Sequence, residues 1–345
     1  MKNIKIGWIG SGFVGQVAHL NSFYSLPNVK IVALSELREK LGRISCKRYN
    51  IENYYSNYQE MIDKENLDAV VAIVRRHHTA PIAKNILNSK NNLFTEKPMA
   101  MNLQQAKLLN KISSKNNLLY CIGNMRRFDS NVQNTKKILL KNNFNLGDLI
   151  SFNCFCYAGY DYCNVDGFVT TNEPPPNKII WPYYPDWLKK KFRLEYEKFL
   201  TYFVHDFNLI NYFFDETPKI NVSNYSKNGG TINFKYNKFF GNFNFGYLQD
   251  NRWEEGIEFN FTKGKIVLHL TPAFLKNKSS NLKIIYFSKG KSFQKEFKPD
   301  YTWSFKNQAI DFVSKLRKKE KNSISSGINS LKDYKLIEEI WRQID

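Results

Sequence analysis

The stretch Ile4-Lys5-Ile6-Gly7-Trp8-Ile9-Gly10-Ser11-Gly12-Phe13-Val14-Gly15 lies near the start of the chain and decides the fold. Its first six residues form a short apolar run that predicts a buried strand, and a helical pattern follows from residue 14 to residue 24. A Gly-x-Gly-x-x-Gly loop between a strand and a helix allows a pyrophosphate to approach the backbone at the helix N-terminus. We therefore predict that a dinucleotide contacts Gly10, Gly12, Phe13, Val14 and Gly15.

A carboxylate at the end of the next predicted strand supports this interpretation. Residues 30–35 form that strand, and Glu36 follows it, about 20 residues after the glycine loop, where an acidic side chain binds the ribose hydroxyls of NAD. The same carboxylate would repel the 2′-phosphate of NADP, so NAD is favoured. Arg38 can stack on adenine or pair with a 2′-phosphate, which leaves NADP as an alternative.

Apolar segments and helical stretches alternate over the first third of the chain. Further strands are predicted at residues 69–74, 93–95 and 118–122, and helices at residues 58–63, 81–88 and 103–115. This alternation is typical of a doubly wound parallel sheet. We predict an α/β Rossmann domain over residues 1–123.

The remaining residues, 124–345, show a different pattern of short aromatic and β-branched segments bounded by glycine or asparagine. Strands are predicted at 149–157, 219–225, 231–236, 241–248, 256–261, 265–270, 282–287 and 292–297. They indicate a second α/β domain with an open, mostly antiparallel sheet, which we expect to bind substrate and mediate oligomerisation. Helices are predicted at 188–214, 305–318 and 331–344, the last two covering one face of this sheet. A Pro-rich segment at 167–184, with Pro174-Pro175-Pro176, Trp181 and Tyr183, is either a loop over a ligand or a stiff surface excursion.

Composition excludes several functional classes. The chain of 345 residues has 51 Lys and Arg against 31 Asp and Glu, but these charges are scattered and no nucleic-acid-binding module accompanies them. No run of 18 apolar residues predicts a membrane span. The five cysteines, Cys46, Cys121, Cys154, Cys156 and Cys163, lack the spacing of a zinc site. We therefore expect a cytoplasmic protein with reduced thiols and no metal.

The segment Thr95-Glu96-Lys97-Pro98 ends a predicted strand, so it lies at the carboxyl edge of the sheet, where ligands of this fold bind. Together with the glycine loop, Glu96-Lys97-Pro98 resembles the signature of the Gfo/Idh/MocA family, which includes glucose-fructose oxidoreductase and inositol dehydrogenase. Two further motifs, Arg126-Arg127-Phe128-Asp129 and His205-Asp206-Phe207-Asn208, extend the resemblance over nearly the whole chain.

This resemblance implies a sugar or polyol oxidoreductase whose active site lies between two domains. It places Lys97 near the hydroxyl that is oxidised, Glu96 on the nicotinamide side, and His205 toward the same carbon. Oxidation of a carbinol by hydride transfer needs a base for the hydroxyl proton, and a lysine amine can be that base. The resemblance also implies that Arg126 or Arg127 borders the substrate pocket and that the protein is a homodimer or homotetramer.

The chain departs from the family pattern at two places. Thr201 occupies the position, four residues before His205, where many relatives have an aspartate; threonine cannot hold a proton at neutral pH, so proton chemistry shifts to Lys97. Asp206 is a poor substitute, because it points about 100° away from His205 on a helix. The segment Val74-Arg75-Arg76-His77-His78-Thr79 replaces a Thr-Pro-Asn turn, and its arginines are suited to an anionic substrate, the cofactor or solvent.

The sequence therefore predicts NAD(P)-dependent oxidation or reduction at a ring carbon of a sugar, nucleotide sugar or inositol. In this hypothesis Lys97 is the acid/base, and Thr201, His205, Arg126 and Arg127 contact the substrate. Two alternatives remain open. One is a non-catalytic protein that binds NAD and a sugar, and the other is an enzyme that uses tightly bound NAD for a net isomerisation or elimination.

Overall fold

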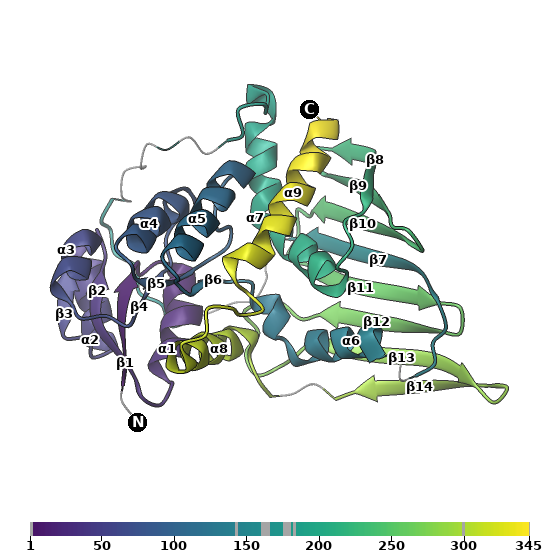
Figure 1. The fold of residues 1–345 in the computed structure, drawn as a ribbon, viewed down its shortest axis with the longest axis horizontal. Helices are drawn as coiled ribbons and strands as arrows, with labels where there is room; N and C mark the ends of the chain where they lie inside the picture. The colour runs from purple at the N-terminus through teal and green to yellow at the C-terminus, as the bar shows by residue number, and fades with distance from the viewer. Residues whose placement is uncertain are drawn as a thin grey trace. The chain divides into compact units, whose positions relative to one another are not determined.

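The computed structural model describes residues 3–141, 144–159, 166–174, 181, 184–298 and 301–344 (Figure 1). By their contacts these residues divide into two compact units. The first unit comprises Met1–Asn124, Val165–Trp187 and Phe305–Tyr334, and the second comprises Met125–Asn164, Leu188–Ser304 and Lys335–Asp345. Of the residues highlighted by the sequence, Cys163, Pro175, Pro176 and Tyr183 lie outside the described part.

The first unit is built on a parallel sheet. Its strands are β1 (Ile4–Ile9), β2 (Val29–Ser35), β3 (Asn53–Tyr55), β4 (Ala69–Ala72), β5 (Asn92–Thr95) and β6 (Tyr120–Ile122), in the order β3-β2-β1-β4-β5-β6. This is the strand order of doubly wound dinucleotide-binding sheets. The predicted parallel α/β sheet is confirmed, and β3 is a strand that the sequence pattern did not predict.

Helices cover this sheet, and one of them comes from a distant part of the chain. They are the π-helical turn η1 (Gly15–Leu20), α1 (Asn21–Tyr24), α2 (Glu39–Arg48), α3 (Tyr58–Lys64), α4 (Arg76–Asn88), α5 (Leu103–Lys115) and α8 (Ser304–Lys318). The Phe312 ring of α8 lies 5.5 Å from that of Phe94 and 6.1 Å from that of Phe23. The expectation that α8 covers the second sheet is therefore wrong, because its apolar face completes the core of the first unit.

The second unit contains a mixed sheet. Its strands are β7 (Leu149–Ala158), β8 (Lys219–Ser226), β9 (Gly229–Lys235), β10 (Phe240–Tyr247), β11 (Trp253–Phe261), β12 (Gly264–Leu270), β13 (Asn281–Ser288) and β14 (Lys291–Phe297). Their order is β14-β13-β12-β11-β7-β10-β9-β8; β7 and β10 run parallel, and the other neighbouring pairs are antiparallel. The predicted open, mostly antiparallel sheet is confirmed.

Aromatic packing holds the helices of this unit on its sheet. These helices are η2 (Met125–Phe128), α6 (Ser130–Lys141), η3 (Lys190–Phe192), α7 (Arg193–Phe213) and the last part of α9 (Gly327–Ile344). On α7, the Phe203 ring lies 5.0 Å from that of Phe245 and the Phe207 ring 5.2 Å from that of Phe243. Trp341 of α9 lies 5.6 Å from Phe199 of α7. Large buried rings of this kind supply most of the apolar area that stabilises a sheet–helix layer.

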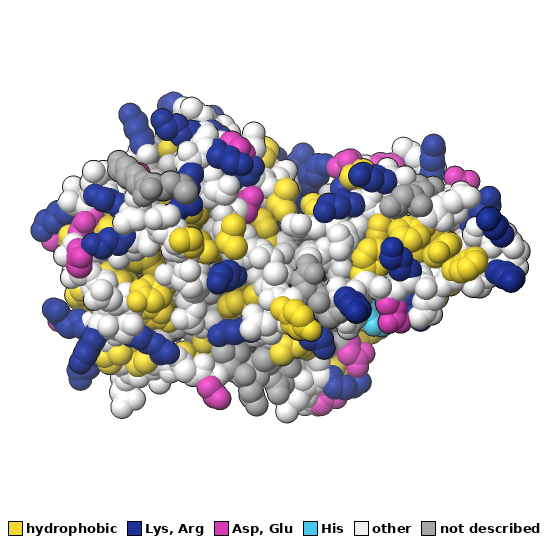
Figure 2. Space-filling view, turned by 90° about the horizontal axis from the view of Figure 1, so that it is seen from below, with side chains coloured by type: hydrophobic (Ala, Val, Ile, Leu, Met, Phe, Trp, Pro, Cys, Tyr) yellow, Lys and Arg dark blue, Asp and Glu magenta, His cyan; other side chains and the backbone are white. Residues whose placement is uncertain are grey.

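On the face of the molecule drawn in Figure 2, positive charge is not gathered into one patch. The net charge is +20, and on the face drawn in Figure 2 the Lys and Arg side chains are separated by acidic, apolar and uncharged groups. Within the described ranges, none of the helices combines the length and apolar character needed to cross a bilayer.

Replacing Phe312 tests the assignment of α8 to the first unit. Phe312→Ala should lower the free energy of unfolding by about 3–5 kcal/mol, because it leaves a cavity between α8 and the parallel sheet. Ile310→Ala, on the same helix but 47% exposed, should cost less than about 1 kcal/mol. Urea titrations followed by circular dichroism measure both values, and equal costs would contradict the packing of α8.

Candidate dinucleotide and catalytic site

The three glycines of the loop serve different physical purposes. Gly10 has φ +91°, and a Cβ there would lie 2.3 Å from the Ile73 carbonyl oxygen, so this position requires glycine. A Cβ at Gly15 would lie 3.3 Å from the Gly10 carbonyl oxygen. A Cβ at Gly12, by contrast, would meet nothing within 4 Å. Gly10 and Gly15 therefore shape the loop, and Gly12 leaves space beside it.

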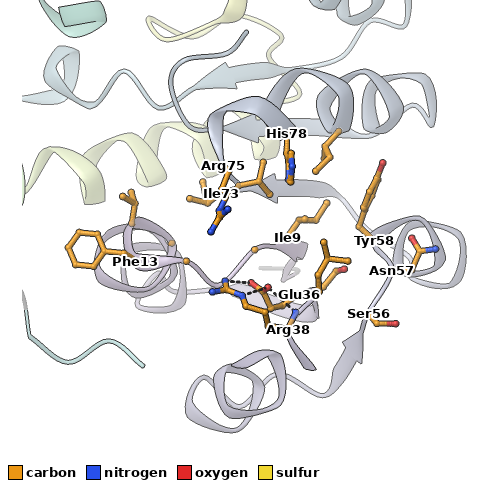
Figure 3. Close-up of a pocket in the computed structure, with 18 residues that line it drawn as sticks. Ile9, Phe13, Glu36, Arg38, Ser56, Asn57, Tyr58, Ile73, Arg75 and His78 are labelled. Atoms are coloured by element: carbon orange, nitrogen blue, oxygen red, sulfur yellow. Dashed lines mark hydrogen bonds and ion pairs between the residues drawn. The ribbon is translucent and has the colours of Figure 1, made fainter. Parts of the chain in front are cut away.

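That space is part of a cavity of about 730 Å³ in the first unit (Figure 3). Most of the predicted cofactor residues line it, namely Gly10, Gly12, Phe13, Val14, Gly15, Glu36 and Arg38. Glu96 and Lys97, which are also predicted to contact the cofactor on its nicotinamide side, are not among its lining residues. The structure adds Ser56, Asn57, Tyr58 and His78, which the sequence reasoning did not assign to the cofactor, and Arg75, for which the cofactor was one of three alternatives. The first three of these residues follow β3, and the last two follow β4. These strands lie on either side of β1 and β2 in the sheet, so the strand order would have indicated these residues. The volume is within the usual range of cofactor sites.

Glu36 connects the end of β2 to the glycine loop. Its carboxylate accepts hydrogen bonds from the Ser11 backbone N–H at 2.8 Å and from Arg38 Nε at 2.9 Å and Nη2 at 3.0 Å. The Arg38 backbone N–H donates a fourth, at 3.1 Å. Four donors occupy the acceptor sites of this carboxylate. Because Arg38 compensates its charge, Glu36 repels a 2′-phosphate less than an unpaired carboxylate would, and the pair suits both NAD and NADP.

Glu96 is bound from two sides. Its Oε1 lies 2.7 Å from His19 Nε2, and its Oε2 accepts the Lys97 backbone N–H at 2.7 Å. His19 is completely buried between the rings of Phe94 and Phe305, at 5.5 and 5.1 Å. The sequence reasoning missed His19, although it lies in the π-helical turn directly after the glycine loop, and such turns are frequent at functional sites. Glu96 thus joins the helix of the dinucleotide loop to the backbone of Lys97.

The Pro-rich segment also contacts the glycine-loop region through its described residues. Val169 exchanges two hydrogen bonds with the side chain of Gln16, both at 2.9 Å, and the Phe168 ring lies 4.9 Å from that of Phe13. The Glu173 carboxylate accepts the backbone N–H groups of Lys40 and Leu41 at the start of α2. Residues 166–174 are therefore fixed to the first unit beside the dinucleotide loop.

The two arginines predicted to border the substrate pocket are both buried within the second unit. Arg127 donates from Nε to Asn208 Oδ1 at 2.6 Å and from Nη2 to the Asn208 carbonyl at 3.0 Å. Arg126 donates to the Thr271 carbonyl at 2.6 Å and forms an ion pair with Glu255. These contacts fix the start of this unit to α7 and to the sheet.

The remaining predicted residues lie on α7. His205 and Thr201 are half-buried, and the Thr201 hydroxyl donates to the Glu197 carbonyl one turn earlier at 2.6 Å. Asp206 is buried, with Cys154 Sγ 3.9 Å from its Oδ1. Burial, together with the negative charge of Glu255, raises the pKa of Asp206 well above its usual value. Asp206 is therefore a structural group that favours its protonated form.

The cysteines in the described part of the chain are buried. Cys46, Cys121, Cys154 and Cys156 are buried free thiols, and burial raises the pKa of each. Over the residues that the structure describes, no cluster of three or more His, Cys, Asp or Glu side chains has an arrangement that could hold a metal ion.

Comparison with known proteins finds a family match over most of the first unit. Residues 4–124 match the family model described as GFO_IDH_MocA, an oxidoreductase family with an NAD-binding Rossmann fold. This match covers the parallel sheet of the first unit, from β1 to β6. Myo-inositol 2-dehydrogenase from Thermotoga maritima is a relative that is 26% identical over 134 residues, or 39% of this chain and 40% of that protein. The chain therefore spans about two fifths of the length of this relative.

Solved structures share the fold over nearly the whole chain. A dehydrogenase from Chromobacterium violaceum has a TM-score of 0.77 at 15% identity, covering 99% of this chain and 96% of that one. The 3-ketoreductase KijD10 from Actinomadura kijaniata, in complex with NADP and TDP-benzene, has a TM-score of 0.74 at 15% identity, covering 98% and 96%. The second unit thus has the fold found in these dehydrogenases and reductases, beyond the Gfo/Idh/MocA match.

Two glycine variants should separate folding from dinucleotide binding. Gly12→Ala should weaken NADH binding about tenfold or more, because its methyl group enters the cavity, while the melting temperature changes by less than about 2 °C. Gly10→Ala should lower the melting temperature by several degrees, because φ is positive and the Ile73 carbonyl is too close. NADH fluorescence titration and thermal denaturation measure the two effects. Unchanged NADH affinity in Gly12→Ala would contradict the assignment of the cavity.

The buried Asp206 should make stability depend on pH. Since its pKa is higher in the folded state than in the unfolded state, the folded protein binds more protons above about pH 4, and its stability falls as pH rises. Asp206→Asn keeps the shape of the neutral side chain and should remove this fall. Asp250→Asn is the control, because hydrogen bonds from Arg252 lower the pKa of this exposed carboxylate and give a small effect of opposite sign. Urea titrations between pH 4 and 8 that are parallel for wild type and Asp206→Asn would contradict the prediction.

Proposed function

We propose that this protein is an NAD(P)-dependent oxidoreductase that interconverts a ring hydroxyl and a ketone in a sugar, nucleotide sugar or inositol. The observation that carries the proposal is the double attachment of Glu96. Its carboxylate binds His19 on the helix of the dinucleotide loop and the backbone of Lys97. This attachment connects the Lys97 backbone to the helix that follows the loop.

The residues of the first unit fit a dinucleotide. Gly12 opens onto the cavity, and the glycine loop precedes a helix N-terminus. We propose that the adenosine ribose binds at Glu36 and Arg38 at the end of β2, where a ribose hydroxyl takes the place of one Arg38 hydrogen bond to the Glu36 carboxylate. Phe13 and Val14 line the same cavity. When bound, the nicotinamide supplies the hydride acceptor or donor. Glu96 and Lys97 are proposed to border its reactive side.

In the oxidation direction, a neutral Lys97 amine accepts the proton of the substrate hydroxyl as the carbon loses a hydride and becomes a carbonyl carbon. In reduction, the ammonium form returns that proton to the oxygen. His205 and Thr201 are proposed to orient the reacting oxygen. The Thr201 hydroxyl already donates to the Glu197 carbonyl, so only its oxygen lone pairs are suited to a substrate group.

The substrate class rests on relatives whose names include an inositol 2-dehydrogenase and a 3-ketoreductase. We propose that Arg126 and Arg127 shape the wall of the substrate pocket, because their guanidinium groups hold Glu255 and Asn208. We also propose a cytoplasmic homodimer or homotetramer that associates through the second sheet. Exposed apolar side chains on its strands, Ile150, Phe240, Phe287 and Phe293, support this association.

Substitution of Lys97 tests the proposed chemistry. Lys97→Met should lower kcat by about 10²–10⁴-fold, because the proton acceptor is lost, and should change the dissociation constant of NADH by less than about threefold. Lys111→Ala, an exposed position on α5, is the charge-matched control. The assay follows nicotinamide absorbance over inositols, free sugars and nucleotide sugars with NAD(H) and NADP(H).

Each outcome separates the proposal from its alternatives. Absence of turnover by the wild type with every substrate, despite tight NADH binding, would favour the non-catalytic protein. Product formation without net change in nicotinamide absorbance would favour isomerisation or elimination with bound NAD. Full activity of Lys97→Met would remove the lysine from the mechanism.

A further inference from the structure

Arg75 is a cavity residue that the proposed function does not use. It is the N-cap residue of α4, directly after the β4 connection, and its side chain is exposed. Figure 3 shows it pointing into the cavity, from the side opposite the Glu36–Arg38 pair. Its guanidinium forms no hydrogen bond or ion pair with any other residue in the described part of the chain.

The strand order fixes the position of Arg75 relative to the glycine loop. In the sheet, β1 lies between β2 and β4, with Ile9 opposite Ser35 on one side and Ala72 on the other. The loop after β1 therefore has the β2 connection on one flank and the β4 connection on the other. Arg38 follows β2 and Arg75 follows β4, so these arginines flank the glycine loop from opposite sides.

The backbone contacts show how close this approach is. A Cβ at Gly10 would lie 2.3 Å from the carbonyl oxygen of Ile73 and 3.3 Å from Cγ1 of Val74. A Cβ at Gly15 would lie 3.7 Å from Cγ2 of the same Ile73. Arg75 directly follows Val74 in the chain. Its backbone thus starts beside the loop, and a long side chain from there is within reach of a group bound at the loop.

The charges in the cavity are not equivalent. Arg38 is paired with Glu36 through two side-chain hydrogen bonds. His78 is buried, and burial, followed by the charges of His77 and Arg75, lowers its pKa, so it is neutral at neutral pH. Among the described residues that line the cavity, Arg75 is therefore the cation whose charge no carboxylate compensates.

We propose that Arg75 binds the pyrophosphate of the dinucleotide, opposite the glycine loop. The N-terminus of a helix attracts phosphate charge, and a guanidinium adds to this attraction because it binds phosphate oxygens with two parallel hydrogen bonds. In this chain Arg75 supplies that guanidinium from the segment that replaces the Thr-Pro-Asn turn. The inference rests on dinucleotide binding by the first unit and is independent of the proposed hydride transfer.

Binding measurements with the full chain test the proposal without any substrate. Isothermal titration calorimetry gives the dissociation constants of NADH, NADPH and ADP-ribose for wild type, Arg75→Ala, Arg75→Lys and Lys111→Ala. Arg75→Ala should weaken all three ligands by about tenfold or more, because each contains the pyrophosphate. Arg75→Lys should recover part of the loss, since it restores the charge but not the pair of parallel hydrogen bonds that a guanidinium donates. Lys111→Ala removes one exposed charge from α5 and should change affinity less than about twofold.

Other patterns would overturn the inference. If Arg75→Ala weakened NADPH but not NADH or ADP-ribose, Arg75 would contact the 2′-phosphate instead. Equal affinity of wild type and Arg75→Ala for all three ligands would place the side chain in solvent. Because Arg75 is exposed, the melting temperatures of the unliganded variants should agree within about 2 °C. If Arg75→Ala melts at a lower temperature, Arg75→Gln replaces it in the binding measurements. Unweakened binding by Arg75→Gln would equally overturn the inference. A wild type that binds none of the three ligands would remove the site itself, whereas loss of turnover with binding intact concerns only the proposed reaction.

Discussion

The bond between His19 and Glu96 is the interaction on which the site depends. A buried carboxylate needs partners, and Glu96 has them on both oxygens: the imidazole of His19 at 2.7 Å and the backbone N–H of Lys97 at 2.7 Å. Gly123 is part of the same arrangement, because a Cβ there would lie 2.7 Å from Glu96 Oε1. The carboxylate therefore ties together the helix after β1, the connection after β5 and the end of β6.

The cofactor cavity follows an electrostatic logic of its own. Glu36, which by sequence alone favours NAD, is compensated by Arg38 and bound to the Ser11 backbone. The carboxylate thereby stabilises the glycine loop, and its ability to repel a 2′-phosphate is reduced. Arg75 adds an uncompensated charge on the opposite flank. In the proposed function, the choice between NAD and NADP therefore depends on the Glu36–Arg38 pair and not on Glu36 alone.

The sequence predicts those elements and site residues whose signals lie within a few neighbouring residues. It does not predict those that depend on a contact with a distant part of the chain. The glycine loop, Glu36 and the helix at 103–115 could be predicted because their patterns are complete within a few residues. The three-residue strand β3 is too short to show a period. The destination of α8 could not be predicted either, because an amphipathic pattern does not specify which sheet it covers. His19 was missed because its partner lies 77 residues away. Arg75 was noticed, yet its role became definable only when β4 was found beside β1.

The most direct measurement is a crystal structure of the full chain with NADH bound. The account predicts the adenosine ribose at Glu36, the pyrophosphate between Gly12 and Arg75, and the nicotinamide beside Lys97, with the His19–Glu96 bond intact. A dinucleotide bound elsewhere, or a nicotinamide remote from Lys97, would contradict it.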